Sequence, residues 1–172
     1  EINKNVAADL QVLGDLRWTL PRFNKKLTAT KEKFAEKFKG WKNEVLKMHK
    51  EHPFSFVEQG DAIKPGALIR KISELADKDT IAVTDVGQHQ MWAAQFFDVF
   101  KPRHFLTSGG QGTMGYGLPA AMGAKIGAPD SRVVLFTGDG SIMMNCQEFA
   151  TIADNNIDVK VVIVHNCILG MV

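Results

Sequence analysis

The stretch Arg132-Val-Val-Leu-Phe-Thr-Gly-Asp-Gly-Ser141 decides the fold, and Val159-Lys-Val-Val-Ile-Val-His-Asn166 repeats its pattern later in the chain. In both, an apolar run of strand type ends in polar residues, and a helix-like stretch separates the two runs. Strands joined by a helix are typically parallel members of one sheet. If the two strands are neighbours, Asp139 and Asn166, which follow the two runs, meet at the carboxyl edge of that sheet.

The predicted meeting of Asp139 and Asn166 indicates a binding site. It puts a carboxylate and an amide oxygen beside the glycine turn that contains Gly138, Gly140 and Ser141. Mg²⁺ prefers oxygen ligands and is often shared with a phosphate, and a glycine turn that opens a helix favours an anion. The pair therefore predicts a site for a metal–diphosphate. Taken singly, Asp139 is typical of a helix N-cap and Asn166 of a turn, and Ser141 either donates to a phosphate oxygen or caps the helix.

Strands and helices alternate along the rest of this region. The remaining predicted elements are strands at 80–84 and 104–107 and helices at 65–76, 88–97, 116–126 and 145–154. This order predicts an α/β fold, a parallel sheet with helices on both faces. Ligands of such sheets bind at the carboxyl ends of the strands, where the loops beginning at Asp85, Ser108, Gly138 and His165 are expected to lie.

The first third of the chain has a different character. Residues 1–27 are mixed, with a turn at Gly14-Asp15, whereas residues 28–50 have a helical pattern with Thr30 as a plausible N-cap. Lysines crowd the polar face of this helix, and a solvated face is a better interpretation than a nucleic-acid or membrane surface. The apolar face of the helix consists of Phe34, Phe38, Trp41, Val45 and Met48.

Composition excludes few classes of protein. The 172 residues are 45% hydrophobic with a net charge of +2, and no apolar run is long enough to span a membrane. Two cysteines, Cys146 and Cys167, make no disulfide framework, which favours a reducing compartment. Because the chain begins at Glu1 and stops at Val172, just after an apolar strand, we expect an excised part of a longer protein.

Two rival hypotheses remain open at this point. Gly110, Gly112 and Gly115 match the G-x-G-x-x-G pattern of dinucleotide-binding proteins, although a single match of this kind is weak. The chain could also be a non-catalytic module that only assembles with a partner. Met114, in the same glycine loop, is explained slightly better by contact with a ligand ring than by core packing.

Longer motifs resemble one enzyme family. Gly138-Asp-Gly followed by Asn166 resembles the motif of thiamine diphosphate enzymes. Gly87-Gln-His-Gln-Met-Trp-Ala-Ala94, Thr107–Ala121, Gly138–Glu148 and Leu169-Gly-Met-Val172 resemble the catalytic large subunits of acetolactate synthases, in their biosynthetic, FAD-containing branch. The resemblance implies that 1–27 ends a central FAD-type domain and that 28–60 is a linker with a basic amphipathic helix. Residues 61–172 would be a thiamine diphosphate-binding domain that is incomplete at its C-terminus.

The resemblance also implies roles for individual residues. The Mg²⁺ ligands would be Asp139, Asn166 and the backbone oxygen of Ile168. Met114 would support the bent cofactor, and Gly112 would hold its aminopyrimidine through the backbone. The residues expected to contact the diphosphate are Val86, Gly87, Gln88, His89, Gly140 and Ser141. His165 departs from the family, which usually has Asn at this position.

As a transferase of this family, the complete enzyme would decarboxylate pyruvate and pass the two-carbon unit to a second 2-keto acid such as 2-ketobutyrate. This is the first common step of branched-chain amino-acid biosynthesis, leading to isoleucine and valine. The resemblance implies a homodimer or tetramer, a possible regulatory small subunit, and no nucleic-acid or membrane partner. The compartment would be the cytoplasm in bacteria and the chloroplast or mitochondrion in eukaryotes. The activating glutamate belongs to an N-terminal domain, so we expect no catalytic residue and no synthase activity in this chain alone.

Overall fold

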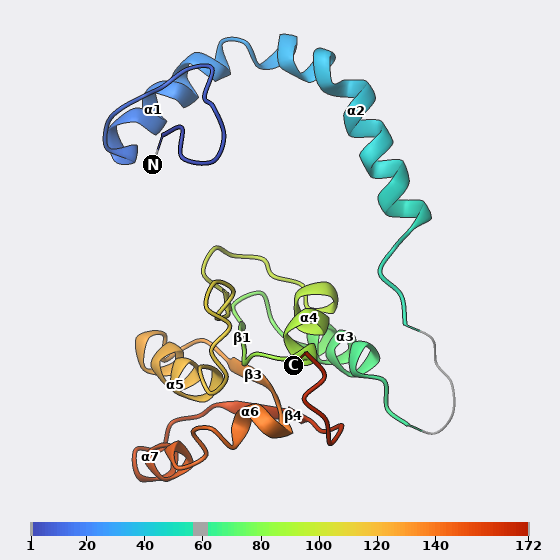
Figure 1. The fold of residues 1–172 in the computed structure, drawn as a ribbon, viewed down its shortest axis with the longest axis vertical. Helices are drawn as coiled ribbons and strands as arrows, with labels where there is room; N and C mark the ends of the chain where they lie inside the picture. Colours follow the sequence, from blue (N-terminus) through green and yellow to red (C-terminus); the bar gives the residue numbers. More distant parts are fainter. Residues whose placement is uncertain (1, 57–61, 172) are drawn as a thin grey trace. The chain divides into compact units, whose positions relative to one another are not determined.

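The computed structural model describes residues 2–56 and 62–171. The chain forms two units, Glu1–Pro53 and Phe54–Val172 (Figure 1). No helix in the described part of the chain is both long and apolar enough to cross a membrane.

The described residues of the first unit form two helices, α1 (Leu16–Thr28) and α2 (Lys31–Glu51). The sequence analysis predicted α2 but not α1. Asp15 begins α1, because its carboxylate accepts a hydrogen bond from the Arg17 N–H at 2.7 Å. The predicted turn at Gly14-Asp15 is therefore the start of a helix, which continues although Pro21 lies inside it.

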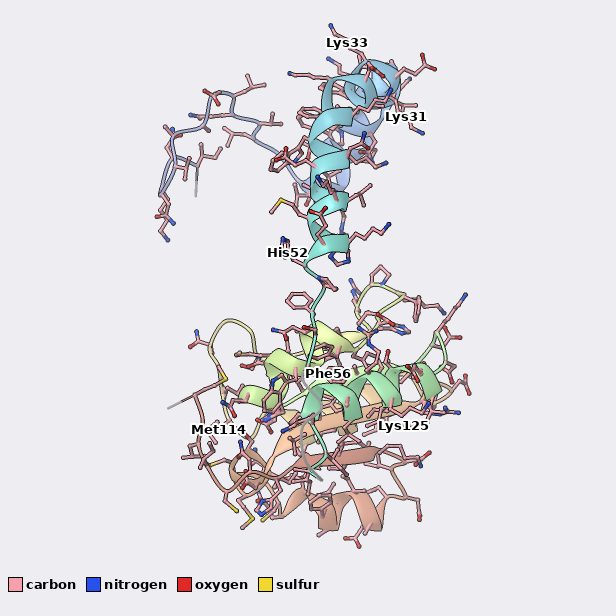
Figure 2. All side chains as sticks on the ribbon, turned by 90° about the vertical axis from the view of Figure 1, so that its right-hand side faces the viewer. Lys31, Lys33, His52, Phe56, Met114 and Lys125 are labelled. Atoms are coloured by element: carbon pink, nitrogen blue, oxygen red, sulfur yellow. The ribbon has the colours of Figure 1, made fainter. Side chains whose placement is uncertain are left out.

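Helix α2 begins after Thr30, but the Thr30 side chain does not cap it. The Thr30 hydroxyl donates at 3.2 Å to the backbone oxygen of Leu27, a residue of the preceding helix α1. No residue of α2 is buried in the described structure, and the predicted apolar face is open, with Trp41 65% exposed. Lys31 and Lys33 mark the first turn of the helix (Figure 2).

The second unit contains the predicted parallel sheet. Its strands are β1 (Ile81–Thr84), β2 (Phe105–Leu106), β3 (Val133–Gly138) and β4 (Lys160–Val164). All pairs are parallel, in the order β2-β1-β3-β4. In the register of β3 and β4, Gly138 pairs with Val164, so Asp139 and His165 each follow the last paired residue of their strands. The predicted α/β fold is confirmed, and the loops after β3 and β4 begin at one edge.

Helices cover both faces of the sheet, as predicted (Figure 1). Helices α3 (Pro65–Leu75) and α4 (Gln88–Phe96) pack on one face, and α5 (Gly117–Gly127), α6 (Asp139–Ile142) and α7 (Glu148–Asp154) pack on the other. The central strand β3 serves both layers because its side chains alternate between the faces. Val134 and Phe136 join Ile69 of α3, whereas Val133 and Leu135 join the α5 side.

An aromatic contact anchors the start of this unit. Phe56 packs edge-on against Phe96 of α4, with ring centroids 5.4 Å apart, and lies beside α3 (Figure 2). A Cβ atom added to Gly66 of α3 would come within 2.8 Å of the Phe96 ring. Glycine at this position therefore lets α3 and α4 approach closely.

The predicted helix at 145–154 begins later than expected, and a short helix that was not predicted precedes it. Helix α6 starts at once with Asp139, and α7 starts only at Glu148. Between them, the Asn145 side chain donates to the backbone oxygen of Gly115 at 2.7 Å. This side chain ties the segment to the glycine loop before α5 instead of pointing out from a continuous helix.

Candidate functional site

A cavity of about 210 Å³ opens at the carboxyl edge of the sheet. The loops after β1, β2, β3 and β4 all contribute residues to it. All the residues to which the sequence analysis gave a cofactor or metal role line this cavity, namely Val86, Gly87, Gln88, His89, Gly112, Met114, Asp139, Gly140, Ser141, Asn166 and Ile168. The sequence analysis expected four loops to meet at this edge of the sheet, and the structure brings their predicted site residues together there.

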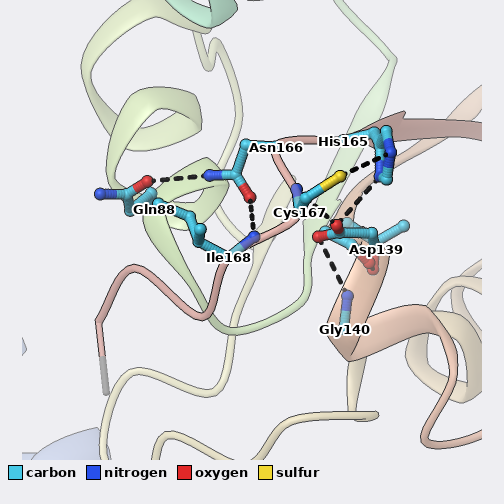
Figure 3. A network of polar contacts seen from close by, with 9 residues as sticks. Gln88, Asp139, Gly140, His165, Asn166, Cys167 and Ile168 are labelled. Carbon is cyan, nitrogen blue, oxygen red and sulfur yellow. Dashed lines mark hydrogen bonds and ion pairs between the residues drawn. The ribbon is translucent and has the colours of Figure 1, made fainter.

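Asp139 supplies the negative charge of the cavity. One carboxylate oxygen accepts the Gly140 N–H at 3.1 Å, and the other accepts the Cys167 N–H at 2.9 Å and lies 2.9 Å from Nδ1 of His165 (Figure 3). Partial burial would raise the pKa of Asp139, but these backbone hydrogen bonds and the nearby His165 outweigh it and lower the pKa. The group is therefore an anion at neutral pH and suited to a cation.

Asn166 lies in the loop after β4, on the side of that loop that contacts α4. Its Nδ2 donates to Oε1 of Gln88 at 3.2 Å, and its Oδ1 accepts the Ile168 N–H at 3.2 Å (Figure 3). Gln88 in turn donates to the backbone oxygen of Gly170 at 3.5 Å. These bonds tie the loop after β4 to the first turn of α4. Asp139 and Asn166 border one cavity but have different partners, and their coordination of one cation stays a prediction.

In the described structure, His89 is a buried residue at the cavity with an unpartnered polar atom. Its side chain is only 4% exposed, and its Nε2 atom has no hydrogen-bond partner among the described residues. Burial lowers the pKa of His89, although the nearby carboxylates of Asp85 and Asp139 partly oppose this shift. The imidazole is therefore neutral at pH 7. A buried polar atom without a partner costs free energy unless something outside the protein satisfies it.

Two glycines make room for the His89 ring. Gly87 has φ +152°, and a Cβ atom there would come within 2.6 Å of the ring carbon Cε1. A Cβ atom on Gly138 would lie 3.0 Å from Nδ1 of the same ring. Side chains at either position would displace the imidazole, so the loops after β1 and β3 together hold it at the cavity.

Asp85 was not assigned a role from the sequence, yet it organises the site. It is fully buried, and its carboxylate accepts the N–H groups of Val86 (2.8 Å), Gly115 (2.8 Å) and Gly117 (3.0 Å). It therefore fastens the glycine loop to the end of β1. An aspartate that directly follows a strand with an apolar centre was the available signal. Asp85 does not itself line the cavity; the lining residues that the sequence analysis gave no role are Trp92, Gly138, Val164, Leu169, Gly170 and Met171.

The Ser141 hydroxyl is also engaged within the protein. It donates to the backbone oxygen of Val86 at 2.6 Å, so it links α6 to the β1 loop. Neither sequence-based alternative for this hydroxyl, a phosphate contact or a helix cap, describes the observed bond. Any contact of Ser141 with a diphosphate would have to use other atoms.

The glycine loop does not have the geometry of a dinucleotide fingerprint. In that motif the glycines join a strand directly to a helix whose N-terminus faces a pyrophosphate. Here the N–H groups of Gly115 and Gly117, where α5 begins, donate to the Asp85 carboxylate. An anion of the protein already occupies these donors, which argues against a nicotinamide cofactor at this loop.

Comparison with known proteins agrees with this geometry. Residues 85–172 match the family described as "Thiamine pyrophosphate enzyme, C-terminal TPP binding domain". The chain belongs to this family. The match begins at Asp85 and includes every loop that lines the cavity.

Acetolactate synthases are similar to the whole chain. The chain is 47% identical to "Acetolactate synthase, chloroplastic" of Arabidopsis thaliana and 41% identical to the acetolactate synthase large subunit of Lactococcus lactis, in both cases over its full length. It is 46% identical to the isozyme 1 large subunit of Escherichia coli over 77% of its length. The chain spans 26%, 29% and 24% of these relatives, respectively. The resemblance inferred from the motifs is confirmed.

Proposed function

We propose that this chain is the diphosphate- and metal-binding part of an acetolactate synthase. The complete enzyme would take pyruvate and a second 2-keto acid as substrates, and Mg²⁺, thiamine diphosphate and FAD as cofactors. Within the described residues, the observation that carries the proposal is the unpartnered Nε2 atom of His89, a buried residue that lines the cavity. An oxygen of a diphosphate would satisfy this atom.

The donor set fits a metal–diphosphate. Asp139 brings a carboxylate whose pKa is lowered, and Asn166 and the backbone of Ile168 bring neutral oxygens. Hard oxygen ligands of this kind suit Mg²⁺, which usually shares its remaining positions with phosphate and water. In this role the Asn166 Oδ1 atom would exchange its bond with the Ile168 N–H for the cation.

The remaining predicted residues would surround the diphosphate. Gly87 and Gly140 would contact the diphosphate through their backbone, but the Gly140 N–H also donates to Asp139 at 3.1 Å. His89 and Leu169 fill the space that side chains at these glycines would need. Gln88 and Val86 line the cavity together with His89. Nε2 of the neutral His89 imidazole would donate to a diphosphate oxygen in the tautomer that carries its single proton on Nε2.

Apolar residues would shape the part of the cavity that receives the cofactor's rings. The methyl carbon of Met114 would lie 3.7 Å from a Cβ atom on Gly140, and Cδ2 of Leu169 would lie 2.5 Å from that Cβ atom. Gly112 has φ +63°, a backbone conformation in which glycine is favoured. When bound, thiamine diphosphate supplies an ylid that stabilises a carbanion, and these residues would hold it bent and shield it from water.

Thermal melting tests the proposal. The midpoint should rise with thiamine diphosphate plus Mg²⁺ but not with Mg²⁺ alone, because a ligand that binds only the native state stabilises it by mass action. At 100 times the dissociation constant the gain is about 2.7 kcal/mol. Asp139→Ala should abolish the rise, and Asp130→Ala, which changes an exposed aspartate outside the cavity, should retain it. A rise with NADH instead would contradict the proposal.

A further inference from the structure

Three different metal-ligating side chains converge beside the cavity. Candidate ligand atoms of Asp139, His165 and Cys167 all lie within 4.8 Å of one another. Nδ1 of His165 is 2.9 Å from Oδ2 of Asp139, and Nε2 of His165 is 3.2 Å from Sγ of Cys167 (Figure 3). The sequence analysis gave Asp139 one role and left the other two side chains without any.

The backbone holds this arrangement in place. Cys167 has φ +58°, which turns the chain sharply after Asn166. The turn directs the Cys167 N–H to the Asp139 carboxylate at 2.9 Å, so the loop after β4 curls around the end of β3. The three side chains are therefore gathered by the fold and by a local backbone turn.

The donor types differ from those that Mg²⁺ prefers. One carboxylate oxygen, one imidazole nitrogen and one thiolate sulfur form a set that suits Zn²⁺ and other thiophilic cations, whereas Mg²⁺ favours oxygen alone. We propose that Asp139, His165 and Cys167 bind Zn²⁺, with water in the fourth position. On binding, the Cys167 thiol releases its proton to solvent as the zinc–sulfur bond forms, and no electrons are transferred.

Access to the three side chains is open. Cys167 is exposed, and the His165 side chain is 66% exposed. A second hollow of about 330 Å³ is lined by Asp139, His165 and Cys167 together with Gly140, Ile168 and Leu169. Zn²⁺ can therefore reach these ligands without passing through the cavity proposed for the cofactor.

The consequence for activity rests on the proposed function. Asp139 would be a ligand in both sites, so a zinc ion held by His165 and Cys167 and a magnesium ion held by Asn166 would share one carboxylate and repel each other as two neighbouring dications. Zn²⁺ should therefore compete with Mg²⁺ and thiamine diphosphate. His165 stands at a position where the family that this chain resembles usually has Asn. The imidazole ligand therefore distinguishes this chain.

Metal titration without thiamine diphosphate tests the site itself. Zn²⁺ is titrated calorimetrically into the reduced full chain, and Co²⁺ is followed by absorption, where a sulfur-to-cobalt charge-transfer band reports a thiolate ligand. Cys167→Ser should remove this band, and Cys167→Ser and His165→Asn should each weaken Zn²⁺ binding by at least about tenfold. Cys146→Ser, which changes the other cysteine, should leave both results unchanged, and circular dichroism of each metal-free variant checks its folding.

The outcomes separate this inference from the proposed function. Unchanged Zn²⁺ affinity in a folded Cys167→Ser variant, or a cobalt complex without the thiolate band, would overturn the zinc site whatever thiamine diphosphate does. Zinc binding that is lost in Cys167→Ser supports the site even if thiamine diphosphate never binds. Simultaneous binding of Zn²⁺ and Mg²⁺–thiamine diphosphate would overturn the competition between the two metals.

Discussion

At the residue scale, two side chains define the chemistry of the cavity in opposite ways. Asp139 is kept charged by backbone N–H groups, whereas His89 is kept neutral by burial. A charged carboxylate attracts a cation. A neutral imidazole can donate a hydrogen bond to an anion without adding a positive charge to the cavity. The two side chains lie on different loops, after β3 and after β1, so only the folded sheet brings them to one cavity.

The lowered pKa of His89 predicts a pH dependence of stability. The unfolded chain binds a proton near the ordinary value of 6.5, whereas the folded chain resists protonation because the ring is buried. As far as His89 is concerned, the free energy of unfolding should therefore have its full value above pH 6.5. It should fall as the pH drops through 6.5 toward the pKa of His89 in the folded chain. Urea unfolding at pH 7 and pH 5 measures this loss.

A matched pair of variants isolates the contribution of His89 to this loss. His89→Gln should have a smaller loss of stability between pH 7 and pH 5 than the parent chain, whereas His49→Gln, which changes an exposed histidine of α2, should have the same loss as the parent. Equal losses in the parent and in His89→Gln would show that the buried imidazole does not resist protonation.

At the element scale, the glycine loop between β2 and α5 is held by residues of other elements. Asp85, at the end of β1, accepts the N–H groups of Gly115 and Gly117, and Asn145 donates to the Gly115 backbone oxygen. Gly117 also packs tightly, because a Cβ atom there would lie 2.8 Å from Leu135 and 2.9 Å from Asp85. The position of the loop at the cavity thus depends on close contact between α5, β1 and β3.

Two glycines of α5 provide a test of this contact. Gly117→Ala should destabilise the chain by about 1–3 kcal/mol, because the new methyl group overpacks the core. Gly123→Ala, in the same helix, has no neighbour within 4 Å and should stabilise the chain by up to about 1 kcal/mol, since alanine favours the helix. Urea unfolding measures both. Equal effects of the two substitutions would show that α5 does not press on Asp85 and Leu135.

Some elements and contacts were outside what the sequence could indicate. The strands followed from short apolar runs, and their parallel direction and the edge that carries the cavity followed from the alternation of strands with helices. The order of the strands in the sheet was not predicted. Helix α1 was missed because Pro21 and mixed polarity hide its period. The break between α6 and α7 depends on the bond from Asn145 to Gly115, and the meeting of His165 with Cys167 depends on a positive φ. Such side-chain pairings arise only in the folded chain.

At the scale of the whole molecule, the two units differ in how they are stabilised. The second unit has a core on both faces of its sheet, whereas α2 in the first unit has no buried residue in the described structure. The family match covers 85–172 and therefore the part of the chain with the cavity. Among the described residues, the candidate binding site thus lies in the unit that contains the sheet. The apolar face of α2 remains exposed.

Calorimetric titration of thiamine diphosphate into the full chain, with and without Mg²⁺, tests the central claim most directly. We predict binding that requires Mg²⁺ and that weakens by at least about tenfold in Asp139→Asn, because an amide keeps the size of the side chain but removes its charge. Asp130→Asn should bind like the parent chain. Binding that persists without Mg²⁺ and is unchanged in Asp139→Asn would contradict a metal–diphosphate site at this edge of the sheet.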